Sequence, residues 1–181
     1  MDTNEISQNL QEAIDWLKKE YAAIRTGQAS PALLDGITIE NYGAFMPLNQ
    51  VSSIGVEDAR TLRISPWDTS SIPAIEKALQ ESNLGVSAAT DSAGVRAIFP
   101  ELTAERRTQL QKLAKSKLED ARITVRGVRD EAMKQIEKLE KDGDISEDEK
   151  FTKKDEVQKK IQETNSTLES LFASKESELA A

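Results

Sequence analysis

The chain of 181 residues contains no histidine and no cysteine, and only 4% of its residues are aromatic. These absences exclude the usual general base, a thiol nucleophile, zinc sites made of histidine or cysteine, and every disulfide. The sequence also lacks an Asp-x-Asp-x-Asp-Gly calcium loop and a glycine-rich phosphate loop. We therefore expect no metal, no cofactor and no enzymatic activity.

Long apolar runs are missing too, and the acidic N-terminus, Met1–Glu5, resembles neither a secretory signal nor a transit peptide. We expect the protein to bind no membrane and to stay in the cytoplasm. Proline is confined to one part of the chain, because all five prolines lie within residues 31–102. The chain therefore divides into three parts.

The first and third parts show helical periodicity. A stripe of apolar residues from Ile6 to Ile24 predicts a helix of roughly 24 residues that ends at Gly27. Beyond residue 103, stripes over 110–139 and 157–179 predict two long helices, with Lys175 as a polar misfit. A break at residues 142–145, followed by a Ser-x-x-Glu capping box at 146–149, predicts that these helices form an antiparallel hairpin.

Residues 31–102 alternate short strand patterns with turn residues. The predicted strands are 37–42, 51–56, 61–65, 86–89 and 95–99, with a turn at 91–94 and one helix over 72–82. We expect Trp67 to pack this helix onto the sheet, and Arg60 and Arg63 to be ordinary surface charges. This segment is predicted to be a small module with its own core.

Together these patterns predict an α+β fold. Residues 1–30 plus 103–181 form a long antiparallel three-helix bundle, and residues 31–102 form a small β/α/β domain inserted between its first two helices. The two crossings, Ala29-Ser30-Pro31 and Pro100-Glu101-Leu102, are expected to act as a hinge. A closed bundle gives no reason to expect oligomers, so we expect a monomer.

Basic residues gather on one face of the second long helix. The protein has a net charge of −8, yet residues 105–141 hold eleven Lys/Arg against seven Asp/Glu. Five of these cations fall within about a third of the helix circumference: Arg107, Lys115, Arg122, Arg126 and Arg129. We call these five residues the basic arc. It is typical of a polyanion-binding surface such as an RNA site, although a solvated face with i,i+4 ion pairs is the alternative.

The chain also resembles the bacterial ribosome recycling factor family over nearly its whole length. The resemblance rests on short motifs in a fixed order: Arg25-Thr26-Gly27-Gln28-Ala29-Ser30-Pro31, Tyr42-Gly43, Pro47-Leu48, Arg60-Thr61-Leu62, Trp67-Asp68, Ile75-Glu76-Lys77-Ala78, Leu102-Thr103-Ala104-Glu105-Arg106-Arg107, Arg126-Gly127-Val128-Arg129 and Asp144-Ile145-Ser146-Glu147-Asp148-Glu149. None of these motifs is specific alone, but their order and spacing are.

The resemblance implies an L-shaped translation factor whose bundle binds the RNA of the large ribosomal subunit after termination. With elongation factor G, which carries and hydrolyses GTP, such a factor splits the ribosome into subunits while its second domain swings about the hinge. The family's essential arginine falls on Arg129, and Arg25, Arg107 and Arg126 also match RNA-binding positions. Gln28 and Asp130 depart from the family, which commonly has arginine at both places.

Two other classes of function remain beside the translation factor. A helical adaptor or chaperone would use the bundle for protein partners alone and would show no special dependence on Arg129. An enzyme would need a convergent set of acid, base or nucleophile, and the sequence shows none. We favour the translation factor.

Overall fold

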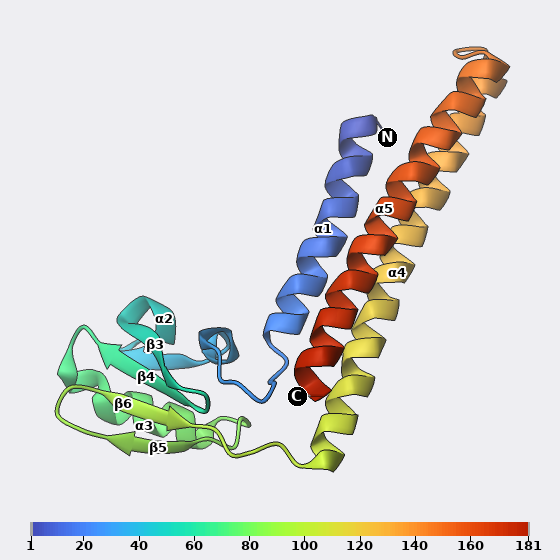
Figure 1. Cartoon of the computed structure of the whole chain (residues 1–181). Coiled ribbons are helices and arrows are strands. Elements are labelled where there is room, and N and C mark those ends of the chain that lie inside the picture. Colours follow the sequence, from blue (N-terminus) through green and yellow to red (C-terminus); the bar gives the residue numbers. More distant parts are fainter. Residues whose placement is uncertain (1, 181) are drawn as a thin grey trace. The chain divides into compact units, whose positions relative to one another are not determined.

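The computed structural model describes residues 2–180 of the chain. These residues divide into two compact units, which we describe separately. The bundle unit contains residues 2–21 and 111–177, and the module unit contains residues 22–110 and 178–180. Figure 1 shows the elements of each unit.

Three long helices carry the bundle unit. They are α1 (Thr3–Ala22), α4 (Ala104–Lys141) and α5 (Glu147–Ala180). The first predicted helix is too long, because α1 ends at Ala22 rather than Gly27. The Thr26 hydroxyl exchanges hydrogen bonds with the backbone N–H and carbonyl of Gln28, both at 3.3 Å. Such local bonds compete with helix hydrogen bonds and favour a turn.

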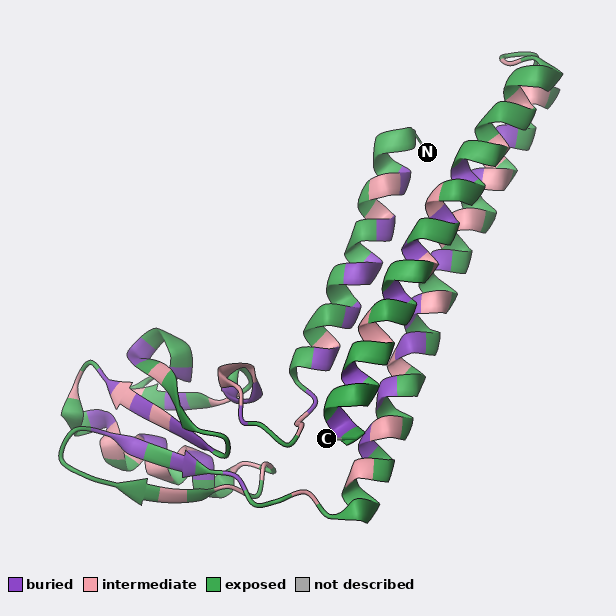
Figure 2. Ribbon diagram, in the orientation of Figure 1, coloured by how far each residue is buried: buried purple, intermediate pink, exposed green. Residues whose placement is uncertain are grey.

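The helix α1 packs its apolar stripe against the other two helices. Ile6, Leu10 and Leu17 are buried on it, and Figure 2 shows the buried positions of the three helices facing one another. The buried Tyr21 hydroxyl donates a hydrogen bond of 2.7 Å to the Ala114 carbonyl of α4. These contacts confirm the predicted three-helix bundle.

Ion pairs fix the register of α4 against α5. Arg122 contacts Glu169 at 2.8 Å, and Lys154 contacts Glu137 at 2.7 Å. Because the α5 number rises as the α4 number falls, the two helices are antiparallel, as predicted. The capping box between them is formed: Ser146 Oγ accepts from the Glu149 N–H at 3.2 Å, and the Glu149 carboxylate accepts from the Ser146 N–H at 2.8 Å.

The module unit contains two small sheets and short helices. Its strands are β1 (Thr38–Asn41), β2 (Ala44–Pro47), β3 (Ser52–Asp58), β4 (Thr61–Pro66), β5 (Ser87–Thr90) and β6 (Val95–Ile98). Its helices are η1 (Pro31–Leu34), α2 (Leu48–Val51), η2 (Thr69–Ser71) and α3 (Ile72–Glu81). The strands β1 and β2 form a hairpin, and the other four form an antiparallel sheet in the order β3-β4-β6-β5.

Most of these elements match the predicted ones, but β2 and the short helices η1, α2 and η2 were not predicted. Tyr42 and Gly43 both have positive φ, at 50° and 80°, and form the two-residue turn that brings β2 back along β1. Gly43 is recognisable in the sequence as the end of a strand, whereas the return strand β2 is not. The predicted turn at residues 91–94 is confirmed, because the Asp91 N–H donates to the Gly94 carbonyl at 3.0 Å.

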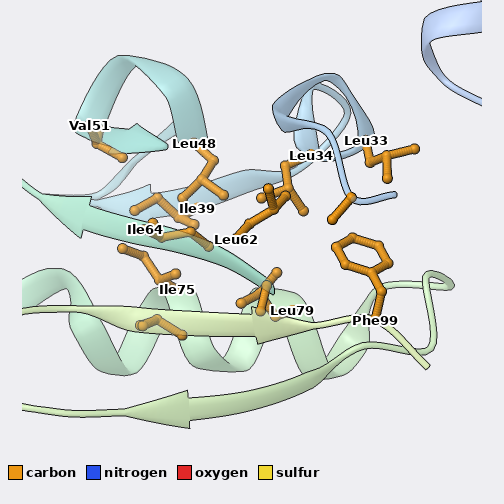
Figure 3. Close-up of a cluster of buried hydrophobic side chains, with 13 residues drawn as sticks. Leu33, Leu34, Ile39, Leu48, Val51, Leu62, Ile64, Ile75, Leu79 and Phe99 are labelled. Atoms are coloured by element: carbon orange, nitrogen blue, oxygen red, sulfur yellow. The ribbon is translucent and has the colours of Figure 1, made fainter. Parts of the chain in front are cut away.

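One apolar cluster holds the module unit together (Figure 3). Leu62 and Ile64 of β4 pair with Ala97 and Val95 of β6, so their side chains share one face of the sheet. The helix α3 and the β1–β2 hairpin supply further buried residues to this cluster: Ile39, Ile75 and Leu79. Trp67 does not join it, because 71% of Trp67 is exposed, and the expectation that it packs α3 onto the sheet is wrong.

Candidate nucleic-acid interface

The basic arc lies on α4, and its members differ in exposure. Lys115 and Arg126 are exposed, whereas Arg107, Arg122 and Arg129 are half-buried. Four of the five residues belong to the bundle unit, and Arg107 belongs to the module unit. The neighbours of each side chain decide which cations are available to a ligand.

Arg122 is engaged within the bundle. Its guanidinium donates to Glu119 Oε1 at 2.6 Å and to Glu169 Oε1 at 2.8 Å, so it links α4 to α5. The hydrogen bonds that Arg122 donates to Glu119 and then to Glu169 raise the pKa of Arg122, with burial acting in the opposite direction. The Arg122 guanidinium therefore stabilises the pairing of α4 with α5 and is less available to a ligand.

Arg129 is held by its own neighbour. Its Nε and Nη2 atoms donate to one oxygen of Asp130, at 3.0 and 2.7 Å. The two side chains remain 38% and 62% exposed. A ligand phosphate would therefore compete with a carboxylate that is already in place on the same turn of the helix.

Lys115 and Arg126 differ from Arg122 and Arg129 because, within residues 2–180, neither of their side chains forms an ion pair. Both project into solvent from the same face of α4, as helical periodicity places them. These two cations offer the most accessible positive charge of the arc.

The remaining predicted contact residues lie in the module unit. The Arg25 guanidinium stacks over the Phe99 ring at 5.3 Å, and burial followed by the charges of Arg60 and Arg106 lowers the Arg25 pKa. Gln28 is exposed. Arg107 donates a hydrogen bond of 3.3 Å to the Leu179 carbonyl.

The predicted hinge residues have unequal environments within the module unit. Ala29 is buried in the apolar cluster and donates a hydrogen bond of 2.7 Å to the Ala59 carbonyl. Ser30 caps η1 by accepting from the Ala32 N–H at 3.3 Å, and Pro31 is the first residue of η1. On the other crossing, residues 100–103 lie outside regular secondary structure, and Pro100 and Glu101 are exposed.

Other kinds of site receive little support from the part of the chain that the structure describes. No helix within residues 2–180 is long and apolar enough to cross a bilayer. Over the same residues, no three acidic, histidine or cysteine side chains are arranged to hold a metal ion. A groove of about 370 Å³ beside Trp16 is lined by polar side chains that include Glu12, Asp120 and Thr124.

The chain matches a known protein family over most of its length. A family model described as "Ribosome recycling factor" matches residues 17–179. The chain belongs to the ribosome recycling factor family. It is therefore a translation factor rather than an enzyme.

Individual family members are similar over nearly the whole chain. The ribosome-recycling factor of Carboxydothermus hydrogenoformans is 43% identical, and the alignment covers 97% of this chain and 95% of that protein. The ribosome-recycling factor of Bacillus licheniformis is 42% identical, again with 97% and 95% covered. The similarity is thus not restricted to one of the two compact units.

Solved structures of the ribosome recycling factor family share the fold. A solution structure of the ribosome recycling factor matches with a TM-score of 0.77 and 36% identity, covering 98% of this chain and 94% of that one. A second match, at a TM-score of 0.68 and 35% identity, covers 98% and 96%. It is described as models for the T. thermophilus ribosome recycling factor and the E. coli elongation factor G bound to the E. coli post-termination complex.

Proposed function

We propose that this protein binds the large ribosomal subunit after termination and, with elongation factor G and GTP, splits the post-termination ribosome into subunits. The full-length match to the ribosome recycling factor family carries this proposal. The related factor bound with elongation factor G to a post-termination complex supports the choice of partners. Since translating ribosomes work in the cytoplasm, the protein acts there.

The surface that binds ribosomal RNA is the basic arc together with Arg25 and Gln28. Arginine suits this task, because its guanidinium binds phosphate oxygens bidentately and keeps its charge. Arg126 and Lys115 are accessible for first contact. Arg129 contributes after its guanidinium exchanges Asp130 for a phosphate, and Arg122 contributes mainly by holding α4 against α5.

The two predicted domains have different roles in this function. Residues 1–30 plus 103–181 bind the ribosome as a monomeric three-helix bundle, and residues 31–102 are the part that moves during splitting. The crossings at Ala29–Pro31 and Pro100–Leu102 join the two. Supporting this, Ala29 and Phe99 are hydrogen-bonded to consecutive module residues, Ala59 and Arg60, so both crossings leave the module at one place.

The first test measures binding of the purified protein to vacant ribosomes and isolated large subunits across a salt series. Arg129→Ala is compared with wild type, and Lys19→Ala on α1 is the control that removes an exposed cation elsewhere. We expect submicromolar affinity that falls steeply with salt, because each neutralised phosphate releases counterions. Arg129→Ala should abolish most binding, whereas Lys19→Ala should leave it unchanged.

A splitting assay with elongation factor G and GTP then follows on the same variants. Subunit release that depends on Arg129 supports the full proposal. Absent binding, or binding equally strong in Arg129→Ala, would contradict it and would favour the helical adaptor that uses protein partners only.

A further inference from the structure

The module segment, residues 31–102, is an unfavourable neighbour for RNA because it is acidic. It contains nine Asp/Glu and four Lys/Arg. Those four cations are Arg60, Arg63, Lys77 and Arg96. A segment of this charge would be repelled by phosphate unless one of its cations were placed to offset the repulsion.

Two of the four cations are neutralised closely within the segment. Arg63 donates to both carboxylate oxygens of Asp91, at 2.6 and 2.8 Å, and Arg96 contacts Glu57 at 2.8 Å. Lys77 lies 3.9 Å from Glu81, one turn away on α3. Arg60 has only a loose contact of 3.8 Å with Glu101, whose side chain is 84% exposed.

Arg60 is also the module cation that lies beside other arginines. Its carbonyl accepts a hydrogen bond of 2.8 Å from the Phe99 N–H, and the ring of Phe99 carries the stacked guanidinium of Arg25. Arg106 follows on the first turn of α4, where its N–H donates to the Thr103 hydroxyl at 3.1 Å. The Arg106 guanidinium donates to Gln109 Oε1 at 3.1 Å. Burial lowers the pKa of Arg25, and the charges of Arg60 and Arg106 lower it further, so both act electrostatically on Arg25.

Like charges that converge in this way oppose folding unless an anion shares them. Two carboxylates act on Arg60, and both do so weakly. Glu101 is 84% exposed and contacts the guanidinium only at 3.8 Å. Asp58 accepts from the backbone N–H of Arg60 at 2.9 Å, and the Arg60 charge is the smallest of the causes that lower the Asp58 pKa. The cluster therefore keeps an excess of positive charge.

We propose that Arg60 and Arg106 extend the RNA-binding surface at Arg25 into a second phosphate-binding site for ribosomal RNA, to which the segment 31–102 contributes Arg60. All three residues lie in the module unit, within residues 22–110. The site rests on the proposed function, because it names an additional RNA contact of the same factor. It was missed in the sequence analysis, which treated Arg60 as an ordinary surface charge, because residues 25, 60 and 106 are far apart in the chain.

Phosphate is the ligand that fits this geometry. The Arg25 guanidinium carbon lies 5.3 Å from the centroid of the Phe99 ring, a cation–π contact that uses none of its N–H donors. Arginines supply all three positive charges, and arginine is preferred over lysine where two oxygens of a phosphate are bound bidentately. A ligand with several linked phosphates, such as RNA, can contact more than one of the three guanidinium groups at once.

The test compares Arg60→Gln with Arg96→Gln. Both variants remove one positive charge from the module, and the two side chains are equally exposed, at 48% and 49%. Binding to isolated large subunits is measured over a salt series. We expect Arg60→Gln to weaken binding about three- to tenfold and to reduce the log–log salt slope by roughly 0.7–0.9. Arg96→Gln should match wild type.

A third variant is expected to raise the affinity for large subunits. A gain in affinity cannot result from damage to the fold. Glu101→Gln removes the carboxylate nearest to Arg60, so binding should tighten, and the double variant Arg60→Gln/Glu101→Gln should lose most of that gain. If Arg60→Gln binds like wild type while Arg129→Ala does not bind, the second site is wrong and the proposed function stands. If wild type does not bind large subunits, both are overturned.

Discussion

Arg129 and Asp130, adjacent residues on the exposed side of α4, are joined by two hydrogen bonds to a single carboxylate oxygen, at 3.0 and 2.7 Å. The guanidinium expected to matter most for RNA binding is therefore occupied in the unbound protein. Exposed ion pairs of this kind contribute about 0.2–1 kcal/mol. Asp130 thus acts as a mild internal competitor that lowers the affinity without changing what is bound.

Asp130→Asn should consequently tighten binding to large subunits by about two- to fivefold, since the competing ion pair is lost. The affinity should be measured in parallel with Asp120→Asn, which removes an acid from another face of α4. If the two variants bind alike, Asp130 does not compete with RNA.

Arg122 and Arg126 should separate stability from binding although they lie one turn apart. Arg122→Gln breaks the contacts to Glu119 and Glu169 and should lower the free energy of unfolding by about 0.5–1 kcal/mol, with little loss of ribosome affinity. Arg126→Gln should weaken binding and leave the unfolding midpoint unchanged. Urea denaturation and subunit binding, measured on both variants, check this; the reverse pattern would contradict the assignment.

Tyr21 should make the bundle sensitive to alkali. Burial raises the Tyr21 pKa to about 12, with the charge of Arg122 acting in the opposite direction. Because the pKa is raised in the folded state, the stabilisation is complete below about pH 10 and is lost as the pH rises toward 12. Tyr21→Phe should cost about 0.5–1.5 kcal/mol at neutral pH, because its hydrogen bond to Ala114 is lost.

The alkaline part of this prediction is checked by unfolding both proteins at pH 8 and pH 11 and following the helix signal. The gap between wild type and Tyr21→Phe should narrow at pH 11. A constant gap would show that Tyr21 does not titrate with unfolding.

Gly94 should be irreplaceable in the module. A Cβ atom added there would lie 2.2 Å from the Ile64 carbonyl oxygen, and backbone cannot yield as a side chain can. Gly94→Ala should destabilise the module by more than about 2 kcal/mol. Gly36→Ala is the control, since nothing lies within 4 Å of its added Cβ. Hydrogen exchange of the β4 and β6 amides measures the effect, and equal protection in both variants would contradict it.

Periodicity predicted the elements whose signal is long. The apolar stripes of α4 and α5 run over many turns, and the Ser146–Glu149 box marks the start of α5. The strand β2 escaped because its residues, Ala44–Pro47, are all apolar and show no alternation, and because the positive φ of Tyr42 that turns the chain back is not visible in the sequence. The end of α1 was misplaced because the Thr26 side chain hydrogen-bonds to the backbone of Gln28, which a search for glycine does not detect.

The candidate site was predictable as a list of cations but not as an arrangement of them. Helical spacing placed the basic arc on one face, yet it could not tell that Arg122 bridges to Glu169 while Arg126 remains unpaired among the described residues. Tertiary packing decides those partners. Arg60 shows the same limit, because its neighbours Arg25 and Arg106 come from distant parts of the chain.

The backbone hydrogen bonds from Ala29 to Ala59 and from Phe99 to Arg60 have a consequence for protein engineering. They bring the entry and the exit of the inserted segment to consecutive residues of one turn. A segment that starts and finishes at the same point can be excised and its cut ends rejoined by a short glycine linker, or grafted into a loop of another scaffold. The β/α module is therefore a suitable unit for excision or grafting in protein engineering.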